Sequence, residues 1–481
     1  MELIVFILYL VFMIGIGVYF FLRTKNGGEK MYFLGGRKMG PWVTALSAGA
    51  SDMSAWVLMG MPAAIFAKGL GQIWIPVGLL LGYTLSWIAE APRLRKFSLA
   101  ANDSITIPQY LTNRFLSKSK VLQVLCAAVF LFAYTIYAAS SIKACGTLFH
   151  TVIGIDPQIA MYLAAAVIIA YTFFGGFSAV CWTDFFQGLL MLGALMLAPI
   201  FALGAIDFSV TTGQTAAYWN AFADWKSVVS GLGWGLGYFG MPHIIIRFLS
   251  LRSQKDVKKS AGIGIGWTLL ILGFATAVGI LGRILFSSDG AASVDSSLVF
   301  IEMVRKLFPA IVSGILLSAI LAASMSTADS QLLSAASALT SDVYRPILRK
   351  NKAGDKEMQW VGRGVVLLIA VAALVIAKSP GSGSIMSLVE NAWGIFGAAF
   401  GPVILLSLYW KRFTFSGAVA GIVAGAAVDI LWLVFLSSTG IYEIIPGFLM
   451  SAIVAVVVTL LSPKPSAETE ALFDSAVSYE D

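Results

Sequence analysis

The sequence predicts an all-α polytopic membrane protein with 13 transmembrane helices, and three observations carry this prediction. Of the 481 residues, 58% are apolar and 12% are charged, compared with about 45–50% and about 25% in soluble proteins. The apolar residues form runs of the length that a helix needs to cross a bilayer, about 20 residues. The basic residues gather in alternate connections between these runs. A chain of this composition cannot cover its surface with polar groups, so its solvent is lipid.

Polar residues, glycines and prolines separate the apolar runs and set the expected spans. These are 2–22, 42–65, 70–90, 119–149, 157–175, 183–205, 226–248, 260–283, 309–339, 358–377, 384–409, 413–437 and 445–463. Together they predict a single transmembrane domain over residues 1–463. Residues 464–481 form a short acidic tail, which we expect to be cytoplasmic and disordered because its composition is strongly polar. Its acidic residues are Glu468, Glu470, Asp474, Glu480 and Asp481.

The basic residues predict the orientation of the chain. Of the 32 lysines and arginines, 25 lie in alternate connections and six in the opposite ones. Arg247 is counted with the first group, at the end of the 226–248 span, whereas Lys143 lies within a span. Because basic residues are retained on the cytoplasmic side, we expect an outer N-terminus and a cytoplasmic C-terminus in the cell's inner (plasma) membrane. This distribution also explains the net charge of +7 without a nucleic-acid partner.

Few residues are suited to enzymatic chemistry. The two histidines and three cysteines all lie inside or at the ends of apolar runs. No CxxC, HExxH, phosphate-binding loop or GxSxG motif occurs in the sequence. We therefore do not expect an enzyme.

Two of the spans contain residues that favour an interrupted helix. The 42–65 span has the small and polar run 46–54, which contains Asp52. The 226–248 span has five glycines from Gly231 to Gly240, followed by Pro242. Non-helical backbone within a membrane requires a polar cavity. The alternative is close helix packing through small residues, and for the 42–65 span alone the two interpretations are equally favoured.

The positions of these spans decide between the interpretations. Each opens a set of five spans, over residues 42–205 and 226–409, and five is an odd number, so the second set has inverted topology. Interrupted segments at corresponding positions of inverted halves mark the central site of a transporter. The 2–22 span and the spans within 413–463 are then additions to this repeat.

The 309–339 span carries a stripe of small and hydroxyl-bearing residues at three- and four-residue spacing. This pattern is typical of tight packing, but adjacent hydroxyls beside the carbonyls of a broken helix also supply the neutral oxygens that a hard monovalent cation prefers. The residues of the stripe are Ala319, Ala323, Ser326, Thr327, Ser330 and Ser334.

At these positions the sequence resembles the solute:sodium symporter family, most closely its bacterial proline-transporting members. The matching segments follow in order along nearly the whole chain. They are residues 34–37, 44–54, 135–137, 171–177, 179–180, 182–184, 233–239, 315–323, 325–327 and 396–402.

The resemblance implies a LeuT-type inverted repeat, alternating access and import of L-proline coupled to Na⁺ as the bound ion. It implies a sodium site made by the carbonyls of Ala50, Met53 and Ala323 and the hydroxyls of Ser326 and Thr327. It also implies a substrate pocket made by Ser54, Ala55, Trp56, Tyr137, Trp234, Tyr238 and Pro242. Two positions depart from the family pattern, because Ala55 stands where glycine is expected and Met241 where glutamine is expected.

Charged residues within the spans are functional candidates. We expect Asp52 to take part in coupling, and Asp184 and Asp329 to line an ion exit route or form a second ion site. For Asp184, capping the start of a helix is an equally favoured role. Lys143 and Glu390 lie at equal depth and are expected to form an outer gating salt bridge, the alternative being that each reaches the interface separately.

Other functions remain open. The nearest alternative is sodium symport of another small carboxylate or amino acid, such as pantothenate or a monocarboxylate. A channel lacks its repeated carbonyl filter or charged ring, and a membrane sensor lacks an appended signalling domain. The partners that we expect are a small-molecule substrate, a sodium ion and the lipid bilayer, with no obligatory protein partner.

Overall fold

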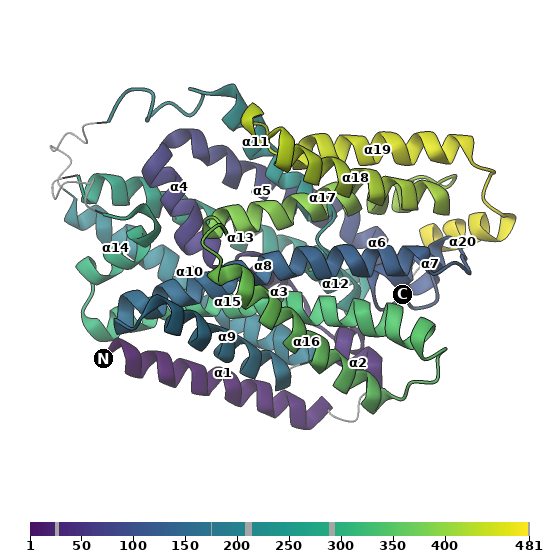
Figure 1. The fold of residues 1–481 in the computed structure, drawn as a ribbon, viewed down its shortest axis with the longest axis horizontal. Helices are drawn as coiled ribbons and strands as arrows, with labels where there is room; N and C mark the ends of the chain where they lie inside the picture. Colours follow the sequence, from purple (N-terminus) through teal and green to yellow (C-terminus); the bar gives the residue numbers. More distant parts are fainter. Residues whose placement is uncertain (25–27, 175, 207–213, 288–293, 480–481) are drawn as a thin grey trace.

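The computed structural model describes residues 1–24, 28–174, 176–206, 214–287 and 294–479, and this part of the chain is built from helices. Long helices run along the longest axis of the molecule, with the N-terminus at one end and the C-terminus toward the other (Figure 1). The described residues form one isolated backbone bridge, between Met39 and Leu251. The predicted all-α class is therefore confirmed.

Ten of the described helices are long and apolar enough to cross a membrane, and a bent pair makes an eleventh. The ten are α1 (Glu2–Thr24), the stretch Leu70–Ala100 that contains α5 (Trp74–Leu85) and α6 (Ala91–Ala100), α8 (Val121–Ile153), α10 (Phe177–Ala205), α13 (Gln254–Leu285), α15 (Ala310–Ser337) with its extension to Leu348, α16 (Asp355–Lys378), α17 (Ile385–Tyr409), α18 (Phe415–Phe435) and α19 (Ile444–Leu461).

The two remaining predicted spans are helical as well. The fifth coincides with α9 (Pro157–Phe174), whose described apolar stretch is shorter, and Gly175 lies outside the described residues. The seventh coincides with three short segments: α11 (Trp225–Gly233), a 3-10 helix (Trp234–Phe239) and α12 (Pro242–Ser250). Shorter helices connect the spans. They are α2 (Gly28–Leu34), α7 (Ile107–Arg114) and α14 (Val299–Leu307).

The second predicted span is interrupted, as expected. Helix α3 (Pro41–Asp52) ends at Met53, whose ψ of 72° leaves the helical region. After Ser54 and Ala55 the chain continues as a π-helical turn (Trp56–Gly60) and α4 (Met61–Lys68). The two halves meet at 59°. Backbone groups that no longer bond within a helix are therefore available where the two halves meet.

The seventh predicted span combines a break with close packing, so both interpretations of its glycines apply. Gly240 and Met241 separate the 3-10 helix from α12. Before the break, the backbone of the 3-10 helix lies directly against α5. A Cβ atom on Gly82 would lie 2.1 Å from the carbonyl oxygen of Gly235, and one on Gly235 would lie 2.4 Å from that of Gly78. No side chain fits between these two segments.

Substituting Gly235→Ala is expected to lower the thermal stability of the purified protein. The added methyl group would meet backbone atoms, which cannot rotate away, and overpacking of this kind costs about 1–3 kcal/mol or more. Gly273→Ala in α13 is the matched control, because a Cβ there meets nothing within 4 Å. Melting temperatures measured in one detergent check the comparison. Equal melting of both variants would contradict the packing.

The expected disorder of the tail is wrong. Residues Ala467–Ser478 form helix α20, whose start is capped by the Ser466 hydroxyl accepting from the backbone N–H of Thr469 at 3.3 Å. The ring of Phe473 is buried 5.2 Å from that of Phe97, and the guanidinium of Arg114 lies 4.8 Å from it. Packing of this apolar side outweighs the polar composition of the segment. Glu480 and Asp481 lie outside the described residues.

Candidate functional site

The two broken spans meet at Asp52. The Tyr238 hydroxyl donates to Asp52 Oδ2 at 2.5 Å. The indole N–H of Trp56 and the hydroxyl of Tyr137 both point to the Asp52 carbonyl oxygen, at 3.1 and 3.4 Å. All four residues are buried, and Asp52 Oδ1 has no hydrogen-bond partner among the described residues. The structure thus brings together four predicted site residues from three separate segments of the chain.

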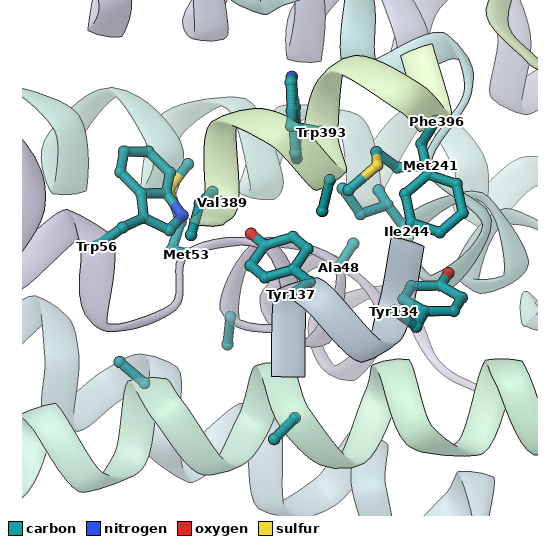
Figure 2. Close-up of a cluster of buried hydrophobic side chains, with 14 of the residues drawn as sticks. Ala48, Met53, Trp56, Tyr134, Tyr137, Met241, Ile244, Val389, Trp393 and Phe396 are labelled. Atoms are coloured by element: carbon teal, nitrogen blue, oxygen red, sulfur yellow. The ribbon is translucent and has the colours of Figure 1, made fainter. Parts of the chain in front are cut away.

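Aromatic rings surround this meeting point. The ring of Trp234 lies 6.3 Å from those of Trp56 and Trp393, and the ring of Tyr238 lies 5.0 Å from that of Trp393. The Trp393 indole donates to the Trp234 carbonyl oxygen at 2.8 Å. Trp393 was missed by the sequence analysis because it stands in an apolar run of α17 with no signal of its own. Figure 2 shows Trp56 on one side of Tyr137 and Met241 on the other.

The remaining predicted pocket residues lie at the two breaks. Ser54 and Ala55 connect α3 to the π-helical turn, and the Ser54 hydroxyl accepts from the Trp56 backbone N–H at 3.5 Å. Pro242 is the first residue of α12, directly after Met241. All four of these positions are buried. The departures at Ala55 and Met241 therefore fall inside the site.

Four of the five predicted sodium ligands converge where α15 crosses α3. The Ser326 hydroxyl lies 2.8 Å from the Ala50 carbonyl oxygen and 3.1 Å from that of Ala323. The Thr327 hydroxyl lies 3.4 Å from the same Ala50 oxygen. Met53 follows one turn after Ala50, and its own N–H bonds to the Gly49 carbonyl at 2.8 Å. Its carbonyl does not enter these contacts.

The donor set fits a hard monovalent cation. The converging atoms are neutral carbonyl and hydroxyl oxygens, which suit such an ion. In the described part of the chain, no group of three or more histidine, cysteine or acidic side chains could hold a metal. A transition metal would need such side chains, so these oxygens suit an alkali cation such as sodium.

A second polar cluster lies one turn along α3 from these oxygens. Arg247 pairs with Asp184 at 3.1 Å and also donates to the hydroxyls of Ser47, at 3.1 Å, and Ser330, at 2.5 Å. Ser47 donates to Asp184 at 2.7 Å, and Ser330 lies 3.3 Å from Asp329 Oδ1. The cluster therefore joins α3, α10, α12 and α15, and it contains both predicted ion-route carboxylates.

Two expectations about this cluster are wrong. Arg247 was placed in a cytoplasmic connection, but it lies inside α12 and is 1% exposed. Asp184 was an equally favoured helix cap, but α10 begins at Phe177, so Asp184 lies about two turns inside the helix. Arg247 was misplaced because a basic residue near the end of an apolar run normally marks the interface, and its partner Asp184 is 63 positions away. Asp184 was misplaced because α10 begins six residues before the predicted span.

The predicted pair of Lys143 and Glu390 is not formed among the described residues. The Lys143 ammonium donates to the Ser382 hydroxyl at 3.0 Å and to the Gly383 carbonyl oxygen. Glu390 lies near the start of α17, where its main-chain carbonyl accepts from the Tyr442 hydroxyl at 2.8 Å. Equal depth in the sequence did not bring these two side chains together: Lys143 bonds to the loop that precedes α17, whereas Glu390 lies within the helix itself.

Comparisons with known proteins agree with this geometry. Residues 32–425 match the model of the Sodium:solute symporter family. The sodium/proline symporter of Escherichia coli K12 is 44% identical over 488 residues, which cover 99% of this chain and 96% of the relative. The osmoregulated proline transporter OpuE of Bacillus subtilis is 42% identical over 475 residues, which cover 97% of this chain and 96% of the relative.

Solved structures support the fold. A Na⁺-coupled sialic acid symporter in a substrate-bound outward-open state superposes with a TM-score of 0.81 at 21% identity, covering 97% of this chain and 98% of that one. A nucleobase-cation-symport-1 family transporter, MHP1, gives 0.55 at 14% identity, covering 92% and 98%. Because the family model and relatives above 40% identity extend along nearly the whole sequence, this chain is an integral membrane protein of the Sodium:solute symporter family.

Proposed function

We propose that this protein imports L-proline together with sodium by alternating access. The observation that carries the proposal is the position of the Ala50, Ala323, Ser326 and Thr327 oxygens, which converge on α3 directly before the break that holds Asp52 and Trp56. Relatives described as proline transporters support this choice of substrate. The relatives are transporters, so the expectation that the chain is not an enzyme is confirmed.

The pocket suits a small zwitterion with an apolar ring. The faces of Trp56 and Trp234 can pack against a pyrrolidine ring. The start of α12 after Met241 is the positive end of a helix dipole, which favours a carboxylate. Asp52 and the Tyr238 hydroxyl can face the ring nitrogen. Each end of the substrate thus has a partner of matching chemistry.

Coupling follows from the shared position of the two sites. A sodium ion held between Ala50 and Ser326 connects α3 to α15 and orders the break, which raises the affinity for substrate. The effect is reciprocal, because it is one coupling free energy. One sodium ion crossing 100 mV releases about 2.3 kcal/mol, and a tenfold sodium gradient adds about 1.4 kcal/mol, which together support about 500-fold accumulation.

The topology belongs to the same proposal. We assign 13 crossings, an inverted repeat over residues 42–205 and 226–409, an outer N-terminus and a cytoplasmic C-terminus in the plasma membrane. In this orientation the cluster of Arg247, Asp184 and Asp329 lies on the cytoplasmic side of the sodium site. Sodium leaving inward would pass it.

Uptake of labelled L-proline into proteoliposomes tests the proposal. An inward sodium gradient should drive accumulation, and a potassium gradient of the same size should not. If proline is not taken up but another carboxylate or amino acid gives sodium-driven accumulation, the protein is a sodium symporter whose substrate is not proline. Uptake that does not saturate with substrate would indicate a channel. No sodium-driven uptake of any solute would overturn the proposal.

Substituting Tyr238→Phe is expected to weaken substrate binding about 5- to 150-fold. The change removes the hydroxyl donor of a buried carboxylate, a loss of about 1–3 kcal/mol, while it keeps the ring against Trp393. The concentration of L-proline that gives half-maximal sodium-driven uptake measures the effect. Tyr83→Phe is the matched control, since its buried ring lies 5.2 Å from that of Tyr238. An equal change in both variants would contradict the role of the hydroxyl.

A further inference from the structure

Two acidic side chains lie buried between α17 and the two helices that follow it. Asp429, in α18, is 0% exposed, and neither of its carboxylate oxygens has a hydrogen-bond partner among the described residues. Glu443, directly before α19, is buried as well, and its Oε1 atom has no partner in the same part of the chain. The central site uses neither residue. These carboxyl groups therefore need an explanation of their own.

Both side chains point to the same place on α17. A Cβ atom on Gly394 would lie 2.8 Å from Asp429 Oδ1 and 3.4 Å from the Cγ atom of Glu443. Glycine at this position thus leaves the two carboxyl groups side by side against the bare backbone of α17. They are close enough for their charges to interact.

A third buried polar group faces the same side of α18. Ser451, in α19, is fully buried, and its hydroxyl has no hydrogen-bond partner among the described residues. A Cβ atom on Gly425, one turn before Asp429, would lie 2.9 Å from the Ser451 Cβ atom. One on Gly447 of α19 would lie 3.1 Å from the Asp429 Cβ atom. The contact between α18 and α19 therefore contains an unused hydroxyl as well as the two acids.

The surroundings of the two acids do not supply a counter-charge. The titratable side chains that face them from α17 and from the turn before α19 are Glu390 and Tyr442. The Tyr442 hydroxyl donates to the main-chain carbonyl of Glu390 at 2.8 Å. Of the lysines on neighbouring elements, Lys68 acts on Glu390, Lys143 of α8 bonds to the loop before α17, and Lys226 of α11 is near the surface. Two ionised carboxylates would thus face each other without compensation.

We propose that Asp429 and Glu443 form a proton-binding site, in which one carboxyl group takes up a proton from the aqueous phase and donates it in a hydrogen bond to the other. Adjacent buried carboxylates cannot both remain ionised without a large cost. A bound proton removes one of the two charges and supplies the O–H donor that the facing oxygens lack. The Ser451 hydroxyl can donate to a remaining oxygen. The ligand of this site is the hydrogen ion.

The site adjoins the wall of the central pocket. Gly394 directly follows Trp393, whose indole donates to the Trp234 carbonyl oxygen at 2.8 Å. Loss of the proton would leave two like charges against Gly394 and separate α18 and α19 from α17. Proton binding therefore stabilises the packing behind this wall, a role that is additional to sodium-coupled transport.

Infrared spectroscopy of the purified protein tests for the proton directly. A protonated carboxyl group has a C=O stretching band that an ionised carboxylate lacks. At neutral pH, the double variant Asp429→Asn, Glu443→Gln should lose part of this band relative to the parent protein. Asp256→Asn is the matched control, because its carboxylate pairs with Arg252 at 2.6 Å and is ionised, so the band should be unchanged. An equal band in the parent and the double variant would overturn the site.

The pH dependence of melting is a second test and uses the single variants. The unfolded chain has released this proton by about pH 6, whereas the folded protein retains it, so raising the pH lowers stability. Between about pH 6 and about pH 9 the melting temperature of the parent should fall. Asp429→Asn or Glu443→Gln should reduce this fall, and Asp256→Asn should not. The same fall in all four proteins would contradict the proposal.

A comparison of sodium with potassium buffer distinguishes a proton from a metal ion. If the two carboxylates held sodium, sodium would raise the melting temperature of the parent by more than that of the double variant, and the proton site would be wrong. An equal effect of sodium on both proteins supports the proton. None of these measurements requires transport, so their outcome is independent of whether the protein imports proline.

Discussion

Replacing Ser326 and Thr327 together by alanine should raise the sodium concentration needed for half-maximal uptake at least about 100-fold. The two hydroxyls are half of the four neutral oxygens that converge at α3 and α15. An interaction of a hydroxyl with a charged group contributes about 1.5–3 kcal/mol, so losing two costs about 3 kcal/mol or more, and each 1.4 kcal/mol is a factor of ten. Initial uptake rates at a series of sodium concentrations measure the change.

Ser318→Ala is the control for this double substitution. Ser318 is a buried serine of the same helix, and its hydroxyl bonds at 2.8 Å to the Gly314 carbonyl oxygen, within α15 itself. Its loss should leave the sodium dependence as it was. An unchanged sodium requirement in the Ser326→Ala, Thr327→Ala protein would show that the ion binds elsewhere.

Arg247→Gln should both stop transport and lower stability. The substitution leaves Asp184, which is fully buried, without its counter-charge, and breaking a buried pair from one side costs about 3–5 kcal/mol. Adding Asp184→Asn to the same chain removes the uncompensated charge, so the double variant should melt at a higher temperature than Arg247→Gln alone. Melting in detergent and sodium-driven uptake, measured on both, separate the structural effect from the functional one.

Arg252→Gln provides the matched comparison. Arg252 also pairs with a carboxylate, that of Asp256 one turn later, but its side chain is 60% exposed. Exposed pairs contribute little to stability, so this variant should melt close to the parent protein. If Arg247→Gln and Arg252→Gln melt alike, the burial of the Arg247 pair has no energetic consequence and the interpretation is wrong.

The fold was predictable to the extent that it depends on local composition. Apolar run lengths located the helices, because each run responds to the bilayer independently of the others. The breaks at Met53 and at Gly240 were also predictable from local composition, since small residues and a proline within a span weaken its helix. Helix ends were less accurate. Helix α10 begins at Phe177 rather than at residue 183.

The site was predictable only where a family resemblance supplied the pairing of distant residues. Residues such as Ala50 and Ser326 meet across 276 positions of sequence, and no local pattern encodes that contact. Where the resemblance offered nothing, inference from depth alone failed for Lys143, which bonds to the loop before α17. Trp393 and Arg247 were missed because their partners, Trp234 and Asp184, are set by tertiary packing.

The glycine contact between α5 and the second broken span has a kinematic consequence. Two backbones that touch without side chains between them have little room to move independently. We therefore expect helix α5 and the segment from Gly231 to Phe239 to move as one rigid body. During a transport cycle, the distance between spectroscopic labels on α5 and α11 should remain constant, while distances measured across Gly240 and Met241 change. We therefore expect the motions of the transport cycle to occur outside this contact.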